Sequence, residues 1–240
     1  RWTIGWDGRQ VSVKTYPVSV EYPSPLTRRS SPVEACRAEV RRELGLPPDI
    51  RLVVGVDRLD YTKGLVEKIC AIERLLERHD AHQGRVVLAQ IAEPSRTGVA
   101  AYREYHARVA ETACRVNARF GTENYRPIIL LDTRHEPSDV FRFLRAADVC
   151  YVGSLRDGMN LVAKEFVVAR DDHRGVLVLS AFAGAARELT AALIINPTDL
   201  NACAETVAAA LCMPAAEQAT RLRVMRSVVA RYNTYRWAEE

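Results

Sequence analysis

Two cationic side chains follow an apolar run, where a buried strand would end. The stretch VGVDRLDYTKGL, residues 54–65, places Arg58 and Lys63 five residues apart in a loop between an expected strand and an expected helix. Both can turn toward one point, where a planar arginine fork and a compact lysine charge would neutralise a diphosphate without a metal ion. The alternative is that Arg58 pairs with Asp57 or Asp60 and that Lys63 is solvated.

A second polar stretch, LRDGMNLVAKEF at residues 155–166, follows another apolar run. Asp157 begins a tight turn, and the free amides of residues 158–161 at the start of the next helix would form a cradle for an anion or a hydroxyl group. Glu165 lies close enough to accept hydrogen bonds from vicinal hydroxyls such as those of a ribose. The alternatives are a helix N-cap for Asp157, a surface glutamate for Glu165 and an exposed or structural role for Lys164.

Two further loops follow apolar runs. In AEPSRTG, residues 92–98, Arg96 could meet a second phosphate or could simply be solvated. In SAFAGAARELT, residues 180–190, the small residues allow close approach of the backbone to a neighbouring element or a ligand, and packing is the preferred interpretation.

Several familiar cofactor motifs are absent from the sequence. No GxGxxG follows an expected strand and no GxxxxGK[ST] occurs, which argues against a nicotinamide dehydrogenase or a P-loop enzyme. The five histidines have no zinc-like spacing. The sequence therefore predicts a site without a metal or a bound cofactor.

These loops would be positioned by a regular alternation of short Val/Ile/Leu strands and amphipathic helices. Such a pattern predicts a doubly wound α/β fold, with a parallel sheet covered on both faces and ligands at the carboxyl ends of its strands. The predicted strands are 52–56, 86–91, 128–131, 149–153, 176–180 and 193–196. The predicted helices are 33–44, 65–78, 98–119, 138–146, 160–169, 200–212 and 214–231. Before them, residues 10–22 alternate like a strand and a proline-rich stretch resembles a linker.

The composition predicts a soluble globular protein. The 240 residues are 48% hydrophobic, and the net charge of +4 comes from 34 basic and 30 acidic side chains that are interspersed along the chain. This distribution argues against a nucleic-acid or membrane surface. The six cysteines are scattered without a CxxC pair, which favours reduced thiols in a cytoplasmic protein. A chain that begins Arg1-Trp2, without methionine, is expected to be a fragment.

Four of these stretches, taken in order, resemble the trehalose-6-phosphate synthases, which are retaining glycosyltransferases of the two-domain GT-B type. The matching motifs are GVDRLDYTKGL, AEPSR, LRDGMNLVAKEF, and VLVLSAFAGAARELT followed by LIINPTD, and the resemblance runs from about residue 11 to the end. It implies a Rossmann-like C-terminal domain that binds the donor. It also implies transfer of glucose from UDP-glucose, or another nucleotide-glucose, to glucose 6-phosphate without a metal.

The resemblance assigns roles to individual residues. Arg58 and Lys63 would hold the donor diphosphate, Glu165 the ribose and Asp157 the glucose hydroxyls, while Arg96 would reach the acceptor phosphate. Backbone amides around the sugar and phosphate would come from Gly158, Met159, Asn160 and Leu161, and a main-chain contact near the base from His135. Arg58, Lys63 and Asp157 would carry the catalysis by a front-face substitution in which the leaving diphosphate helps to remove the acceptor proton.

The resemblance also predicts how the chain is organised. Residues 1–30 would be the last strand of an N-terminal domain and the linker, residues 31–213 the donor-binding domain, and residues 214–240 the closing helices. Because the N-terminal domain is missing, the isolated chain is predicted to be inactive; a homo-oligomer is possible. The alternatives are a synthase with another phosphorylated acceptor, such as a glucosylglycerol-phosphate synthase, and a non-catalytic regulatory relative.

Overall fold

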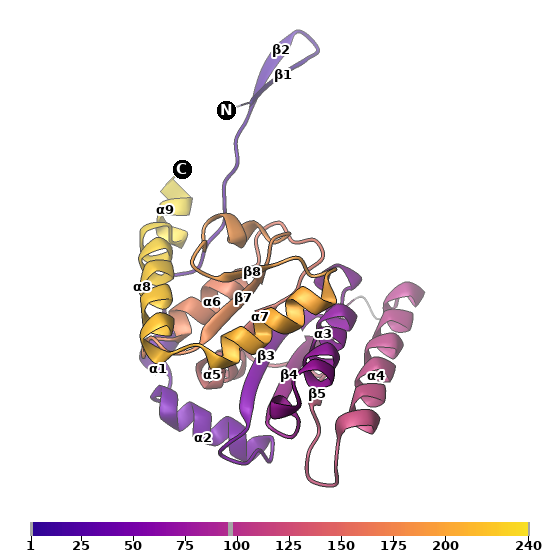
Figure 1. The fold of residues 1–240 in the computed structure, drawn as a ribbon. Helices are drawn as coiled ribbons and strands as arrows, with labels where there is room; N and C mark the ends of the chain where they lie inside the picture. The colour runs from indigo at the N-terminus through magenta and orange to yellow at the C-terminus, as the bar shows by residue number, and fades with distance from the viewer. Residues whose placement is uncertain (1, 96–97, 240) are drawn as a thin grey trace.

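A six-stranded parallel sheet forms the centre of the protein in the computed structural model, which describes residues 2–95 and 98–239. The strand order is β5-β4-β3-β6-β7-β8 (Figure 1). The strands are β3 (Arg51–Arg58), β4 (Val86–Glu93), β5 (Ile128–Leu131), β6 (Val149–Val152), β7 (Val176–Ser180) and β8 (Leu193–Ile195). The order reverses between β3 and β6, and such a switch point is where doubly wound sheets bind ligands.

Helices cover both faces of this sheet. One face packs against α3 (Leu65–Arg78), α4 (Ala100–Phe120) and α7 (Leu200–Cys212). The other packs against α2 (Val33–Glu43), α5 (Pro137–Ala146), α6 (Leu161–Ala169) and α8 (Ala215–Arg231). The predicted α/β, doubly wound architecture is therefore confirmed.

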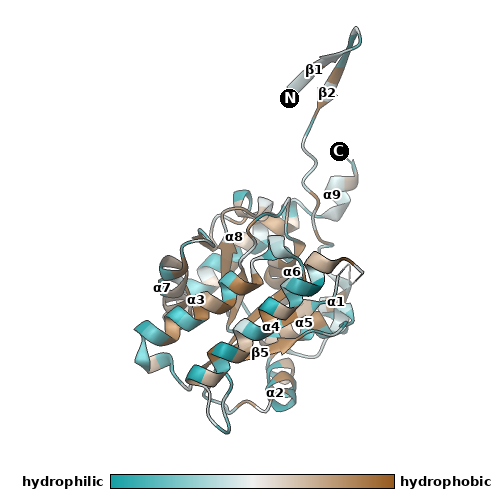
Figure 2. Ribbon diagram, turned by 90° about the vertical axis from the view of Figure 1, so that its right-hand side faces the viewer, coloured by the Kyte–Doolittle hydropathy of each residue, from teal (hydrophilic) through white to brown (hydrophobic). Residues whose placement is uncertain are grey.

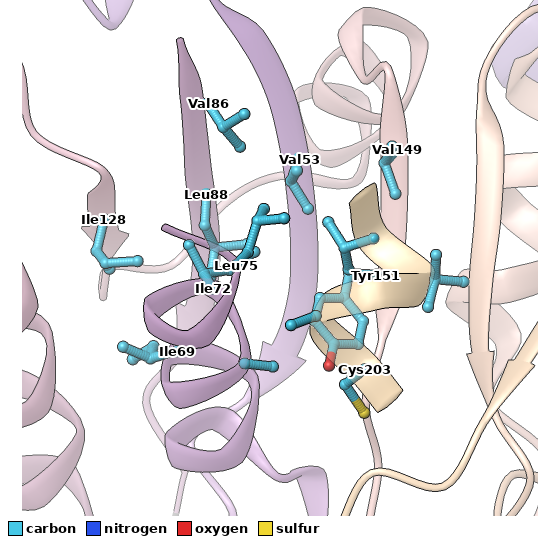
Figure 3. Packing of buried hydrophobic residues seen from close by; sticks show 14 of the residues in the cluster. Val53, Ile69, Ile72, Leu75, Val86, Leu88, Ile128, Val149, Tyr151 and Cys203 are labelled. Atoms are coloured by element: carbon cyan, nitrogen blue, oxygen red, sulfur yellow. The ribbon is translucent and has the colours of Figure 1, made fainter. Parts of the chain in front are cut away.

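The core lies between the sheet and these two helical layers. Val53 and Leu88 of the strands face Ile72 and Leu75 of α3, and Tyr151 lies beside α7 (Figure 3). All five side chains are 1% exposed or less. Strands buried on both faces must be apolar at nearly every position, which explains their unbroken Val/Ile/Leu runs. Figure 2 shows this contrast, with hydrophobic strands behind helices that carry hydrophilic residues on their outer sides.

The two ends of the chain differ from the sequence prediction. The expected strand 10–22 is wrong beyond its beginning: β2 (Arg9–Val13) pairs with β1 (Trp2–Trp6) in an antiparallel hairpin, and residues 14–22 form no strand. The short helix α1 (Pro25–Arg29) was not predicted, and the short helix α9 (Thr234–Glu239) lies within residues 214–240, where the resemblance implied closing helices. The hairpin extends away from the sheet and its helices (Figure 1), and both of its strands are fully exposed.

The segment that follows the hairpin lies against the C-terminal segment. The Thr234 amide donates to the Val20 carbonyl at 3.0 Å, and its hydroxyl donates to the Ser19 carbonyl at 2.7 Å. The Trp237 indole donates to the Tyr16 carbonyl at 3.2 Å. The two segments that connect the domain to its ends are thereby joined beside α6 and α8.

Candidate functional site

A cavity of about 450 Å³ opens at the carboxyl ends of β3, β4 and β6. Seven of the residues predicted for the site line it: Arg58, Lys63, His135, Asp157, Met159, Asn160 and Leu161. A larger hollow of about 710 Å³ lies between α4, β5 and the loop after α2, and it contains none of them. The predicted chemistry therefore gathers at the switch point of the sheet, as the strand order requires.

An ion pair between Lys63 and Asp157 joins the loop after β3 to the loop after β6. The Lys63 Nζ lies 2.6 Å from Asp157 Oδ2, and both side chains are mostly buried. Burial alone would raise the pKa of Asp157, but hydrogen bonds from Lys63 and Asn160 and the charge of Lys63 lower it below its usual value. Asp157 is therefore an ionised acceptor, and the alternative that Lys63 is merely solvated is wrong.

Asn160 organises the start of α6. Its backbone has a φ of +74°, its Oδ1 accepts from the Ala163 amide at 3.0 Å, and its Nδ2 donates to Asp157 Oδ2 at 3.1 Å. Asn tolerates this left-handed conformation better than most residues. The helix cap is thus Asn160 rather than Asp157, so one side chain both caps the helix and holds the carboxylate.

The N-terminus of α6 faces the cavity. Leu161 and Val162 occupy the first two helical positions and line the cavity, and amides at such positions have no acceptor within the helix. The helix dipole adds positive potential there, equivalent to roughly half an elementary charge. Of residues 158–161, predicted to form an anion cradle, Met159, Asn160 and Leu161 line the cavity together with Val162, whereas Gly158 does not.

Arg58 is a cation of the site without a side-chain partner among the described residues. Its side chain makes no hydrogen bond or ion pair with any residue in the described ranges, and the residue is exposed at the rim of the cavity. The alternative that Arg58 pairs with Asp57 is wrong, because Asp57 is buried and pairs with Lys68. Asp60 instead accepts hydrogen bonds from the Thr62 amide and hydroxyl, at 2.9 and 2.7 Å, and caps the 3₁₀ turn that carries Lys63.

A buried polar cluster that the sequence analysis missed supports the floor of the cavity. The Lys68 Nζ lies 2.6 Å from Asp57 Oδ2 and 2.9 Å from Gln90 Oε1, and the Gln90 Nε2 donates to the same Asp57 oxygen at 3.2 Å. Burial raises the pKa of Asp57, while the charge and hydrogen bonds of Lys68 and Gln90 oppose the shift. A signal was available, since Lys68 shares the apolar face of α3 with Leu65 and Ile72.

Backbone contacts fix the relative positions of three loops around the cavity. The Leu155 amide donates to the Thr62 carbonyl at 2.8 Å, and the Ala185 amide donates to the Met159 carbonyl at 2.7 Å. Gly184 is required because a Cβ there would lie 2.1 Å from the Gly158 carbonyl oxygen. Gly64 has a φ of +65°, and a Cβ there would lie 2.3 Å from the Gly153 carbonyl oxygen. The small residues of 180–190 thus serve packing, which is the interpretation that the sequence analysis preferred.

Glu165 lies outside this cavity, in an adjoining hollow of about 360 Å³. Leu161 lines both spaces, so the two are neighbours. Burial raises the pKa of Glu165, and its carboxylate accepts no hydrogen bond from the described part of the chain. Glu165 is therefore available to a ligand and is not an ordinary surface glutamate. Lys164 is structural: it is fully buried and lies 2.9 Å from Glu188.

One further predicted residue, His135, lies within the described ranges. His135 lines the cavity opposite α6, and its Nδ1 lies 2.8 Å from the Thr133 carbonyl oxygen. Arg96 lies outside the described residues. Within 2–95 and 98–239, no cluster of three or more His, Cys, Asp or Glu side chains has the geometry of a metal site. No helix in those ranges is both long enough and apolar enough to cross a bilayer.

The fold and the site together define a Rossmann-like domain with a cavity and a helix N-terminus at the switch point of its sheet. The model of glycosyltransferase family 20 matches residues 3–240, and the chain belongs to that family. It is 40% identical to a trehalose-6-phosphate synthase of Klebsiella pneumoniae over 96% of this chain and 48% of that protein. It is 39% identical to that of Salmonella typhimurium strain LT2 over 98% of this chain and 49% of that protein.

Solved structures agree with this assignment. A Burkholderia xenovorans α,α-trehalose-phosphate synthase (UDP-forming), in complex with glucose 6-phosphate, superposes with a TM-score of 0.91 at 40% identity, covering 99% of this chain and 52% of that one. An Escherichia coli relative bound to UDP-2-fluoro-glucose gives 0.90 at 37% identity, covering 97% and 51%. The resemblance inferred from the motifs is confirmed, and the chain spans about half the length of the relatives it matches.

Proposed function

We propose that this chain is the donor-binding half of a glycosyltransferase that moves glucose from UDP-glucose to glucose 6-phosphate and forms α,α-trehalose 6-phosphate with retention. The observation that carries the proposal is the convergence of three positive groups on one cavity: unpaired Arg58, paired Lys63 and the N-terminus of α6. A leaving diphosphate needs this electrostatic environment. The relatives are UDP-forming or bound to a UDP-glucose analogue, which supports UDP as the nucleotide.

We assign the donor contacts from these positions. Arg58 and Lys63 bind the diphosphate together with the amides at Leu161 and Val162, and Asp157 accepts hydrogen bonds from the glucose hydroxyls. Glu165, in the adjoining hollow, binds the ribose, and the His135 backbone lies near the base. Arg96 reaches the acceptor phosphate.

The environment of Asp157 favours a binding role over a nucleophilic one. Its carboxylate already accepts hydrogen bonds from the Lys63 amine, the Asn160 amide and, at 3.3 Å, the Ser154 hydroxyl. Its lowered pKa also makes it a weak base. We therefore assign to Asp157 the orientation of the sugar, with no covalent intermediate on the protein.

The chemistry then occurs on one face of the sugar. The bond from C1 to the diphosphate oxygen breaks, a bond from C1 to the acceptor oxygen forms, and the acceptor proton passes to an oxygen of the leaving diphosphate. Arg58, Lys63 and the α6 amides stabilise the negative charge that develops on this group, and no metal is required. Because the chain spans about half the length of its relatives, we propose that the groups that hold the acceptor come mainly from the other half and that the 240-residue chain does not turn over alone.

Calorimetric titration tests the donor assignment. The chain is titrated with UDP-glucose, ADP-glucose and GDP-glucose, and UDP-glucose is expected to bind most tightly. Arg58→Ala should weaken that binding about tenfold or more, because it removes a charged hydrogen-bond donor. The matched control is Arg29→Ala, which also removes an exposed arginine whose side chain makes no hydrogen bond or ion pair with a described residue.

Two outcomes would contradict the proposal. One is equal weakening by Arg58→Ala and Arg29→Ala, which would indicate only general charge attraction. The other is the absence of nucleotide binding by both the folded chain and the full-length protein. Steady formation of trehalose 6-phosphate by the 240-residue chain would refute the prediction that this chain is inactive alone. Comparing glucose 6-phosphate with glycerol 3-phosphate as acceptors of the full-length protein would separate the two synthase alternatives.

A further inference from the structure

A second charged cavity lies at the opposite edge of the sheet from the candidate donor site. It has a volume of about 330 Å³ and is bounded by the amino-terminal ends of three strands. Arg51 is the first residue of β3, Asp148 immediately precedes β6, and Gly175 immediately precedes β7. The donor cavity follows the carboxyl ends of β3, β4 and β6, so the two spaces share no residue.

Positive charge is in excess in this second cavity. Two arginines that line the cavity contact the carboxylate of Asp148, Arg37 at 3.0 Å and Arg51 at 3.5 Å, and Arg41, which does not line it, reaches the same carboxylate at 3.7 Å. The same carboxylate also accepts from the Leu52 amide at 2.8 Å. The pKa of Arg41 is lowered by burial and by the charges of Arg37 and Arg51, although the charge of Asp148 acts in the opposite direction. One carboxylate cannot compensate three cations.

The remaining charges do not cancel this excess. Arg170 is 1% exposed and is neutralised by Asp172 at 2.8 Å. Arg174, on the rim, makes no side-chain hydrogen bond or ion pair with any residue in the described ranges. The third acid among the described residues that line the cavity is Glu34, which lies 4.0 Å from Arg37, but its side chain is 88% exposed and its charge is therefore well screened by water.

A helix N-terminus adds to the positive potential. Ala215 lines the cavity and is the first residue of the 17-residue helix α8, so its amide has no acceptor within the helix. One turn later, the Gln218 Oε1 accepts from the Gly175 amide at 2.8 Å and fixes the helix against the loop before β7. The start of α8 is thereby held beside Arg174.

We propose that this cavity binds the phosphate group of a small, non-aromatic phosphate compound. Arginine forks and helix amides suit a phosphate dianion. A volume of about 330 Å³ is at the low end for small-molecule sites, which fits a phosphomonoester of a few carbon atoms or inorganic phosphate. None of the residues lining the cavity is aromatic, so it offers no stacking surface for a nucleobase. The donor nucleotide is thus a poor occupant.

Amide-resolved NMR titration of the 240-residue chain distinguishes this site from the donor site. The probes are inorganic phosphate and glycerol 3-phosphate, added at constant ionic strength. Saturable shifts are expected at the amides of Gly175 and Ala215. In the Arg51→Ala/Arg174→Ala variant, the dissociation constant for the same probe should rise about tenfold, because two exposed guanidinium donors are lost.

The control variant is Arg29→Ala/Arg42→Ala, which changes the net charge equally at two exposed arginines that do not line the cavity. It should retain the shifts and the affinity. Tighter binding of the ester than of phosphate would support a metabolite as the occupant, and equal binding would support inorganic phosphate. Shifts confined to residues 158–162, no saturable shift, or equal weakening in both variants would overturn the proposal. None of these results depends on whether UDP-glucose is the donor.

Discussion

Replacing the buried Lys68 with methionine should destabilise the domain strongly, although Lys68 touches no predicted ligand. Its Nζ is completely buried, 2.6 Å from Asp57 Oδ2, and methionine fills a similar volume without the charge. Removing one partner of a buried ion pair leaves the other uncompensated and costs about 3–5 kcal/mol. We expect Lys68→Met to lower the free energy of unfolding by that amount.

The pH dependence of Lys68→Met follows from the sign of the Asp57 shift. Burial raises the pKa of Asp57, and the variant loses the lowering effect of Lys68, so the folded-state pKa rises further above the unfolded value of about 3.9. The native variant then holds its proton more tightly than the unfolded chain does. Its stability is greatest below the unfolded pKa and falls as pH rises through the folded pKa. The deficit relative to wild type should therefore be smaller at acidic pH than at neutral pH.

Urea denaturation at 25 °C measures the loss of unfolding free energy in Lys68→Met. An unchanged m-value would show that the variant exposes the same surface on unfolding as the wild type. The Asp57→Asn/Lys68→Met double variant is the key comparison, since removing both charges should cost less than the sum of the single changes. Arg58→Ala, an exposed and unpaired arginine, should change stability by at most about 0.5 kcal/mol. A loss below about 1 kcal/mol for Lys68→Met, or strict additivity in the double variant, would refute this reasoning.

Three further predictions follow from the site. Arg58→Ala should weaken UDP-glucose binding about tenfold or more with little loss of stability, as calorimetry and urea denaturation would show; parallel losses would contradict its role as a free cation. Because the pKa of Asp157 is lower in the folded protein than in the unfolded chain, its ionised form stabilises the fold at pH values above the unfolded pKa, and this stabilisation is lost as pH falls through the folded pKa. The difference in unfolding free energy between wild type and Asp157→Asn should therefore shrink in acid. A difference that does not change with pH would argue against the ion pair. Gly184→Ala should cost about 1–3 kcal/mol in urea denaturation, because its Cβ would meet the Gly158 carbonyl oxygen at 2.1 Å; wild-type stability and donor affinity would show that the loop contact is not needed.

The core of the fold was predictable because its strands are buried on both faces. Runs such as IILL and VLVLS allow no amphipathic alternative, and β5 and β7 begin and end where the sequence predicted. The hairpin at the start was missed even though its signal is present: Asp7-Gly8 lies between two alternating segments, and both residues have the positive φ that a tight hairpin turn requires.

The candidate site was only partly predictable. Arg58, Lys63 and Asp157 could be placed together because each follows the carboxyl end of a parallel strand, and topology brings those ends to one edge. The pairing of Lys63 with Asp157, 94 residues away, depends on side-chain geometry that spacing does not encode. The separation of Glu165 into its own hollow depends likewise on how α6 packs beside the segment at residues 19–20.

A crystal structure of this chain with UDP would show whether this cavity holds the nucleotide-sugar donor. We expect the diphosphate to lie within hydrogen-bonding distance, about 3 Å, of the Arg58 guanidinium, the Lys63 amine and the amides at Leu161 and Val162. The ribose should extend toward Glu165 in the adjoining hollow. UDP bound elsewhere, or bound here with Arg58 turned away from the phosphates, would contradict the assignment of this cavity to the nucleotide-sugar donor.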